Sequence, residues 1–152
     1  MNTLEKFAFP PRVTVPENAY GVLTIPDLKI TLPLYQDQGK GQLNIDRESA
    51  GNLNTYGRNW LIEDHAGSKD GEGVWDMCNV KIGMTAFLHT LTKIYKYRCY
   101  QMTEVENRKY YFAHNGKMVQ ALSSKDILTT SCTDRDGVQI LVAWSYVYEM
   151  PE

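Results

Sequence analysis

Residues 127–143 read ILTTSCTDRDGVQILVA, and they predict a local structure by themselves. An apolar and β-branched run, Ile127–Cys132, is followed by a polar turn that ends in Gly137 and then by a second apolar run. Two strands joined by a short loop are the natural interpretation of this pattern. Cys132 ends the first strand. A thiol at a strand end is accessible from the adjoining loop and is held by a rigid element, so Cys132 is a candidate nucleophile.

The composition indicates one mainly β domain. The chain has 152 residues, of which 43% are hydrophobic and 22% charged, and its ten tyrosines favour strands. The net charge is -2 and no cluster of Lys and Arg stands out, so we expect no nucleic-acid partner. No run of 18 apolar residues occurs, so we expect no membrane span. Neither Cys78 nor Cys99 belongs to a CxxC motif, and both are expected to be small buried hydrophobic residues.

Other runs of the same kind predict further strands. They cover residues 21–25, 30–35, 59–64, 85–91, 94–105, 110–113, 117–122 and 139–148. Pro33 restricts the second of these to a sheet edge or a bulge. Residues 36–58 are polar and rich in glycine, and we expect them to wrap the surface, whereas 74–80 should form a helical turn. Short strands at this spacing, with almost no helix, predict an all-β barrel or sandwich.

Histidine is the natural partner for a reactive thiol, and three are available. His114 lies in a predicted turn and is expected to be a turn residue, whereas His89 lies within a strand and is expected to be a structural or surface histidine. His65 ends the strand 59–64 as Cys132 ends its own, and a thiol beside an imidazole can ionise to a thiolate–imidazolium pair. The spacing is also compatible with coincidence. Zinc is the competing use of His65 and Cys132, but close-spaced ligand pairs are missing, so we expect no metal and no cofactor.

The order of these motifs resembles that of the sortases, cysteine transpeptidases of bacterial cell surfaces. The similarity runs from about Tyr20 to Val147. It rests on the following segments: Gly21–Pro26 with Leu32–Tyr35, Ala50-Gly51, Leu61–His65, Val74–Gly83, Ile94–Arg98, Leu128–Thr133 and Ile140–Ala143. The segment before Thr133 is similar to the family's Thr-Leu-x-Thr-Cys motif, and Leu61–His65 to the strand that ends in its catalytic histidine.

The resemblance implies an eight-stranded sortase-like β-barrel over residues 20–152, preceded by an N-terminal arm, residues 1–19. It implies Cys132 as the nucleophile and His65 as the acid and base. The substrate would be the sorting-signal peptide of a surface protein, such as Leu-Pro-x-Thr-Gly, held as a thioacyl enzyme. An amine nucleophile from peptidoglycan or a pilin would then accept it. Ser131, Thr133 and Gln139 are expected to bind the substrate.

Three positions depart from the family's pattern. Asp64 stands where a glycine commonly precedes the histidine, and Ser131 replaces a threonine. Gln139 stands where the family has an essential arginine, and it carries no charge. We expect Arg135 to take over as the third catalytic residue. The alternatives are a catalytically weak or inactive sortase-fold protein that binds a peptide, and a β-barrel interaction domain of unrelated function.

The expected cellular location depends on the resemblance and on whether a leader or an anchor precedes residue 1. Residues 1–12 lack the apolar core of a signal peptide. Sortases work at the cell surface, so the resemblance implies an extracytoplasmic location if a leader or an anchor has been removed. Without one the protein is expected to be cytoplasmic.

Overall fold

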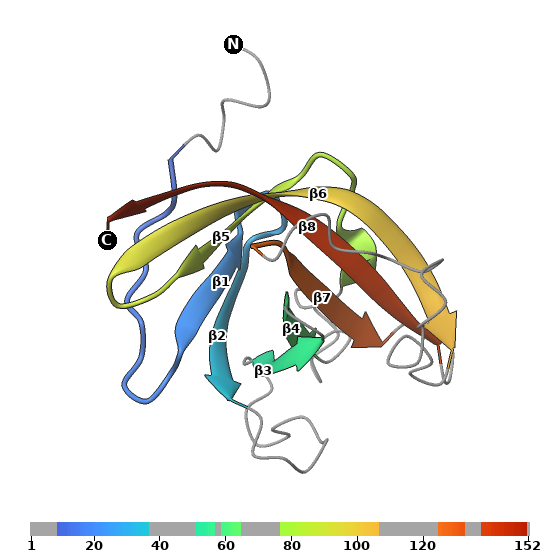
Figure 1. The fold of residues 1–152 in the computed structure, drawn as a ribbon, viewed down its shortest axis with the longest axis horizontal. Coiled ribbons are helices and arrows are strands. Elements are labelled where there is room, and N and C mark those ends of the chain that lie inside the picture. Colours follow the sequence, from blue (N-terminus) through green and yellow to red (C-terminus); the bar gives the residue numbers. More distant parts are fainter. Residues whose placement is uncertain are drawn as a thin grey trace.

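The computed structural model describes residues 9–36, 51–56, 59–64, 77–106, 125–132 and 138–151. Within them, eight strands close into a barrel in the order β1-β2-β3-β4-β7-β8-β6-β5 (Figure 1). The prediction of an all-β, eight-stranded barrel is therefore confirmed. Closure pairs every strand on both sides, which removes the free edges that β proteins otherwise have to protect.

Seven of the eight described strands, all except β3, begin and end within three residues of the predicted boundaries. They are β1 Gly21–Ile25, β2 Ile30–Gln36, β3 Gly51–Tyr56, β4 Asn59–Asp64, β5 Thr85–His89, β6 Lys93–Glu106, β7 Ile127–Cys132 and β8 Val138–Pro151. Two short 3-10 turns accompany them, η2 Pro26–Leu28 and η3 Met77–Asn79. Three strands, β1, β4 and β7, match the sequence prediction residue for residue, and η3 lies inside the predicted helical turn.

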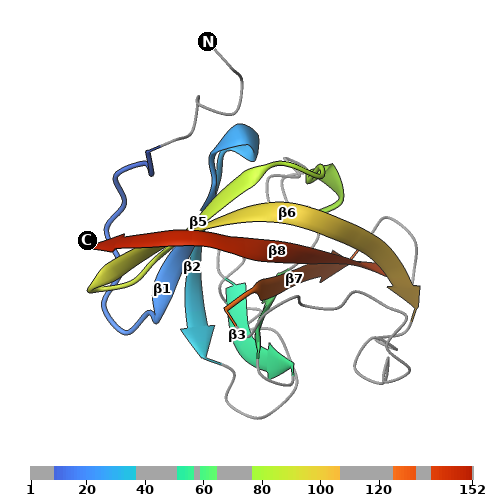
Figure 2. The same ribbon diagram turned by 45° about the horizontal axis from the view of Figure 1, so that its top comes forward.

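The two longest strands, β6 and β8, run side by side along the whole length of the barrel (Figures 1 and 2). Their antiparallel register shifts twice, between Lys96 and Tyr97 and between Cys99 and Gln101. Such irregularities bend a strand and increase its twist, which accounts for the arch that this pair forms over the other strands. The pair links the two ends of the molecule, because β8 begins beside the end of β6 and ends beside its start.

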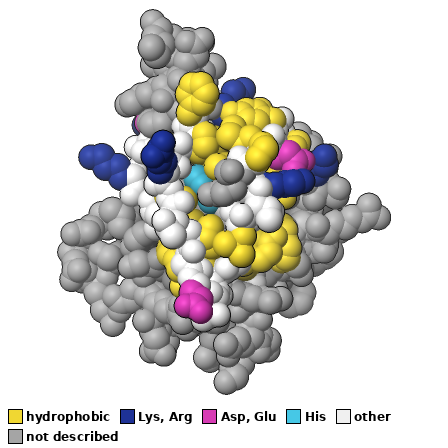
Figure 3. Space-filling model, turned by 90° about the vertical axis from the view of Figure 1, so that its left-hand side faces the viewer, with side chains coloured by type: hydrophobic (Ala, Val, Ile, Leu, Met, Phe, Trp, Pro, Cys, Tyr) yellow, Lys and Arg dark blue, Asp and Glu magenta, His cyan; other side chains and the backbone are white. Residues whose placement is uncertain are grey.

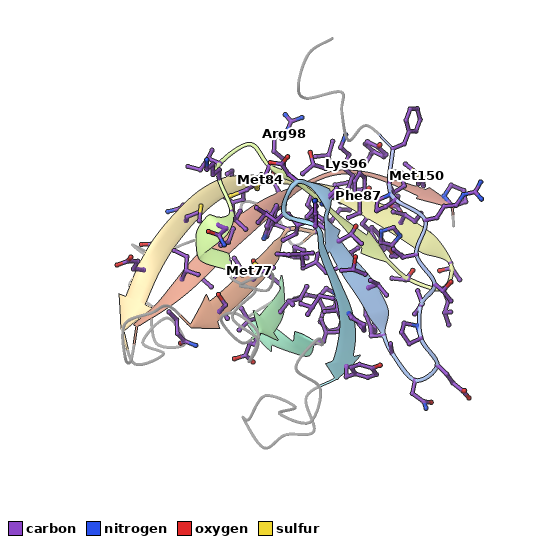
Figure 4. All side chains as sticks on the ribbon, turned by 180° about the vertical axis from the view of Figure 1, so that it is seen from behind. Met77, Met84, Phe87, Lys96, Arg98 and Met150 are labelled. Carbon is purple, nitrogen blue, oxygen red and sulfur yellow. The ribbon has the colours of Figure 1, made fainter. Side chains whose placement is uncertain are left out.

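The core lies inside the barrel and is closed by Trp144 from β8. Its side chain is fully buried, and its Nε1–H donates a 2.8 Å hydrogen bond to Thr129 Oγ1 on β7. Met77 from η3 is fully buried against the same cluster. Figure 4 shows Met77 on the inner side of the β6–β8 pair and Arg98 projecting from the outer side. The 3-10 turn therefore plugs one side of the barrel interior with an apolar side chain.

The sequence prediction was wrong about one strand. Part of residues 36–58, assigned to a surface wrap, forms β3, which pairs in parallel with β2 and antiparallel with β4. Its Leu53 is buried, but its Asn and Thr neighbours concealed the strand pattern. β5 also ends at His89, two residues before the predicted limit. The predicted hairpin around Asn115-Gly116 lies outside the described residues.

The expected edge or bulge position of Pro33 was wrong, because β2 has neighbours on both sides in the closed barrel and pairs with β1 without a register shift. Pro33 pairs with Val22 of β1, while the described ladder between β2 and β3 begins only at Leu34. At Pro33 the structure describes pairing with β1 only. Because proline has no N–H to donate, this position suits it: no described β2–β3 hydrogen bond is lost there.

Candidate functional site

The pairing of β4 with β7 brings two predicted site strands together. The two strands are parallel, and their register runs from Trp60 beside Ile127 to Asp64 beside Ser131. Parallel neighbours run in the same direction, so both strands end at the same edge of the barrel. Cys132 is the next residue after Ser131 and still belongs to β7. The strand that leads to the histidine and the strand that carries the cysteine therefore end side by side.

Three of the predicted site residues lie outside the described residues. In the sequence His65 directly follows Asp64, the last residue of β4. Thr133 and Arg135 follow Cys132 in the segment between β7 and β8. The roles of all three remain predictions.

Gln139 lies directly opposite Cys132. In the antiparallel β7–β8 ladder these two residues are Cα partners, and on its other side Gln139 pairs with Val105 of β6. The residue that takes the family's arginine position by sequence is thus held in a central strand beside the predicted nucleophile. Cα atoms paired in this way are about 4.5–5.5 Å apart.

The side chain of Gln139 is unusual for its surroundings. It is only 9% exposed, and its Oε1 accepts no hydrogen bond within the described part of the chain. Most buried side-chain oxygens are hydrogen-bonded, and one without a partner costs free energy in the folded state. A site that binds a hydrogen-bond donor next to Cys132 would require an acceptor atom without an internal partner, and Gln139 Oε1 is such an atom.

The strands around Cys132 bury both of their faces. One face belongs to the core cluster, with Ile140, Val142 and Trp144 on β8. Successive side chains along a strand point to opposite faces, and paired residues on adjacent strands share a face. The residues that alternate with the core residues therefore form a second face of the sheet. We call this group the second face; its described members are Leu61 and Glu63 on β4, Leu128 and Thr130 on β7, and Gln139, Leu141 and Ala143 on β8. All seven side chains are buried. Gln139 is the polar residue at one end of this largely apolar second face.

Two hydroxyl groups hold β7 in place just before Cys132. Thr130 Oγ1 donates a 2.7 Å hydrogen bond to the carbonyl of Ile140 on β8. Ser131 Oγ accepts a 3.0 Å hydrogen bond from the backbone N–H of Met77, and its side chain is fully buried. Ser131 thereby anchors η3 to β7, a role that the sequence interpretation missed, and its contact with substrate remains a prediction. The adjacent pair of hydroxyl residues ahead of the cysteine was the available signal.

His89 is a structural residue at the other end of the barrel. It is 1% exposed, and its Nε2 lies 3.0 Å from Thr24 Oγ1 in a buried hydrogen bond. Burial lowers the pKa of its imidazole to about 4, so the ring is neutral near pH 7. His89 pairs with Ile94 near the start of β6, whereas the partner of Gln139 on that strand is Val105. Ile94 and Val105 are separated by roughly 35 Å of strand at about 3.3 Å per residue, so His89 and Cys132 lie towards opposite ends of β6.

A hollow opens at this distant end. A cavity of ≈ 450 Å³ is lined by Pro10, Pro11, Arg12, Val13, Thr14, His89 and Ile94. Figure 3 shows a small histidine surface between hydrophobic and other side chains on one face of the molecule. The cavity lies between residues 10–14 and the barrel, far from the paired ends of β4 and β7.

Cys99 also has a structural role. Its thiol is 1% exposed, belongs to the core cluster and forms no disulfide, and burial raises its pKa to about 11. The expectation of a small buried hydrophobic residue is confirmed for Cys99, while the side chain of Cys78 lies outside the description. In the described ranges, no group of three or more His, Cys, Asp or Glu side chains could hold a metal ion.

The fold matches known structures across nearly the whole chain. Sortase E1 from Streptomyces coelicolor, solved with a tripeptide in its active site, superposes with a TM-score of 0.69 at 17% identity, covering 91% of this chain and 94% of that chain. This chain has the sortase fold. Sortase A of Listeria monocytogenes gives a TM-score of 0.66 at 11% identity, with 90% and 92% covered. Sortase C of Streptococcus pneumoniae gives 0.67 at 18%, with 90% and 73% covered.

Sequence comparison adds nothing to this likeness, because no family model matches the chain and no curated protein does. The sortase fold is therefore recognised here by its three-dimensional arrangement. Within the described residues, no helix has the length and apolar character needed to cross a membrane.

Proposed function

We propose that this protein is a sortase-like cysteine transpeptidase. The observation that carries the proposal is the parallel pairing of β4 with β7 in a sortase fold, since it joins the end of the histidine strand to the strand of Cys132. A nucleophile and a base delivered by two neighbouring strand ends form the arrangement that covalent acyl transfer needs. The substrate class comes from the fold relatives, one of which holds a tripeptide in its active site.

The reaction would use Cys132 and His65 in two steps. The Cys132 thiolate attacks the scissile carbonyl carbon of the peptide, and the C–N bond breaks as protonated His65 gives its proton to the leaving amine. The products of this step are a thioester on Cys132 and a free amine. An incoming amine then attacks the thioester, His65 accepts its proton, and the Cys132 thiolate is regenerated. One peptide bond is broken and another formed, so no oxidant or cofactor is required.

The third catalytic role is proposed for Arg135, with Gln139 as a neutral neighbour of the nucleophile. Arg135 lies three residues after Cys132 and could donate to the oxyanion that forms during each attack. The substrate would be the sorting-signal peptide of a surface protein, and the acceptor an amine of peptidoglycan or of a pilin. Such substrates imply an extracytoplasmic place of action.

Mass spectrometry of the intact protein, after incubation with a panel of sorting-signal peptides, tests this proposal. Wild-type protein should gain the mass of the acyl fragment, and proteolytic mapping should place it on Cys132. Cys132→Ala should gain no mass while keeping its circular-dichroism spectrum. His65→Ala should slow adduct formation by at least about a hundredfold, the usual contribution of a general acid or base. A wild-type protein that forms no adduct with any peptide would refute transpeptidase activity.

A second candidate function is peptide binding with little or no chemistry. It is favoured by Gln139, because a neutral amide at the arginine position supplies weaker electrostatic stabilisation to a developing oxyanion. The two candidates separate in one comparison. If the protein is a binder, wild type and Cys132→Ala should bind the peptide equally well, and neither should gain the mass of an acyl group. If it is a transpeptidase, only the protein with Cys132 should gain that mass.

A further inference from the structure

We propose that Gln139 Oε1 accepts a hydrogen bond from a main-chain N–H of the peptide bound next to Cys132, so that this protein recognises its substrate through a neutral amide. The inference deepens the proposed function and rests on it. It concerns the chemistry at the one position where the family's charged residue is missing, and it gives that position a role of its own.

The first argument is the condition of the side chain. Gln139 is only 9% exposed, and within the described part of the chain its Oε1 is the buried side-chain oxygen or nitrogen without a hydrogen-bond partner. The neighbouring polar residues of β7, Thr129, Thr130 and Ser131, all take part in hydrogen bonds. An isolated exception among satisfied neighbours indicates an acceptor that is reserved for a donor from outside the chain.

The second argument is position. Gln139 and Cys132 are Cα partners in the β7–β8 ladder, about 4.5–5.5 Å apart by the geometry of such pairs. A glutamine amide extends several ångströms from its Cα. A peptide whose carbonyl carbon is bonded to Cys132 therefore lies within reach of it. The site is also central, since Gln139 is flanked on its other side by Val105 of β6.

The third argument is the chemistry of the amide. A guanidinium group only donates hydrogen bonds, whereas a glutamine side chain accepts through Oε1 and donates through Nε2. An extended peptide presents both an N–H and a C=O along each edge, so one glutamine amide can satisfy both groups. Neutral recognition of this kind should respond little to salt, because no net charge is neutralised on binding.

The free protein provides the first test. Gln139→Met is close in shape and removes the unpaired oxygen, so its Tm should rise by about 2–4 °C for each kcal/mol recovered. Gln101→Met, at a partly exposed glutamine of β6, is the matched control and should leave Tm unchanged. A Tm for Gln139→Met at or below the wild-type value would show that Oε1 is already satisfied and would overturn the proposal.

A backbone ester scan provides the second test. Peptides in which one N–H at a time is replaced by an ester oxygen are compared for adduct formation by wild type and for binding by Cys132→Ala. One ester position should weaken both by about fivefold, and Gln139→Met should lose that selectivity. Adducts that form equally with every ester would overturn this proposal alone. A dependence on a side-chain hydroxyl in place of an N–H would also overturn it. The absence of any adduct or binding would refute the proposed function and this inference together.

Discussion

His89 should make the folded protein sensitive to mild acid. Its imidazole is buried between strands, forms a hydrogen bond with Thr24 Oγ1, and has a pKa lowered by burial from 6.5 to about 4. Above pH 6.5 the folded and unfolded states are both neutral at this position, so His89 makes no pH-dependent contribution. Between pH 6.5 and about 4 only the unfolded state binds the proton, so the free energy of unfolding decreases as pH falls. Below about 4 the effect is complete.

The magnitude follows from the interval between the two pKa values. Each pKa unit corresponds to 1.36 kcal/mol, so a lowering from 6.5 to about 4 corresponds to about 3 kcal/mol of lost stability. For a domain with a total stability of roughly 5–15 kcal/mol this loss is large. Carboxylates also titrate in this range, so the contribution of His89 has to be isolated by a variant that does not titrate.

The assay is urea unfolding of wild type and His89→Gln at about pH 7.5 and about pH 4. Glutamine can still form a hydrogen bond with Thr24 but carries no titrating group, so wild type should lose about 3 kcal/mol more than the variant across this range. Equal losses in the two proteins would refute the assignment of a neutral, buried His89. The variant should also leave the pH dependence of adduct formation unchanged, because the residue lies roughly 35 Å from the β7 strand end along β6.

Three further outcomes are expected. Cys132 should react with iodoacetamide faster than Cys99, whose buried thiol has its pKa raised to about 11, and equal labelling in a mass map would contradict an activated thiol. Trp144→Phe removes the N–H that donates a hydrogen bond to Thr129 Oγ1 in the core, and should lower the free energy of unfolding in urea by about 1–3 kcal/mol. An unchanged unfolding midpoint would show that this bond contributes nothing. Gly21→Ala would place a Cβ against a facing backbone carbonyl of β5, so its Tm should fall by several degrees, and a wild-type Tm would refute the close approach.

The strands that carry the candidate site were predictable from sequence because their apolar and β-branched runs are bounded by clear breaks. Residues 59–64 and 127–132 became β4 and β7 without a shift. β3 escaped prediction because Asn52 and Asn54 are poor strand formers, and only pairing with β2 and β4 makes a strand there stable. That stabilisation is tertiary, so no local pattern announces it.

The candidate site also has features that the sequence predicted and features that it could not predict. The importance of Cys132 and of the Gln139 position was predicted from motif order; the ladder shows that the two residues are Cα partners, and their roles stay predictions. The parallel contact between β4 and β7 could not be read from local sequence, since no turn connects these strands. The orphaned Oε1 was equally hidden, because a glutamine in an apolar run carries no sign of whether its oxygen finds a partner.

The parallel ladder between β4 and β7 also has a consequence for the order in which the molecule assembles. The hydrogen bond from Asn59 Nδ2 to the Asp126 carbonyl, at the start of this ladder, closes a loop of 67 residues. Contacts this distant in sequence form slowly, since chain entropy is lost before they contribute any stability. During synthesis the hairpin of β1 and β2 can form early, whereas the β4–β7 ladder can form only after Ile127–Cys132 has been synthesised. The barrel edge that contains Cys132 is therefore expected to order only when β7 joins β4, later than the β1–β2 hairpin.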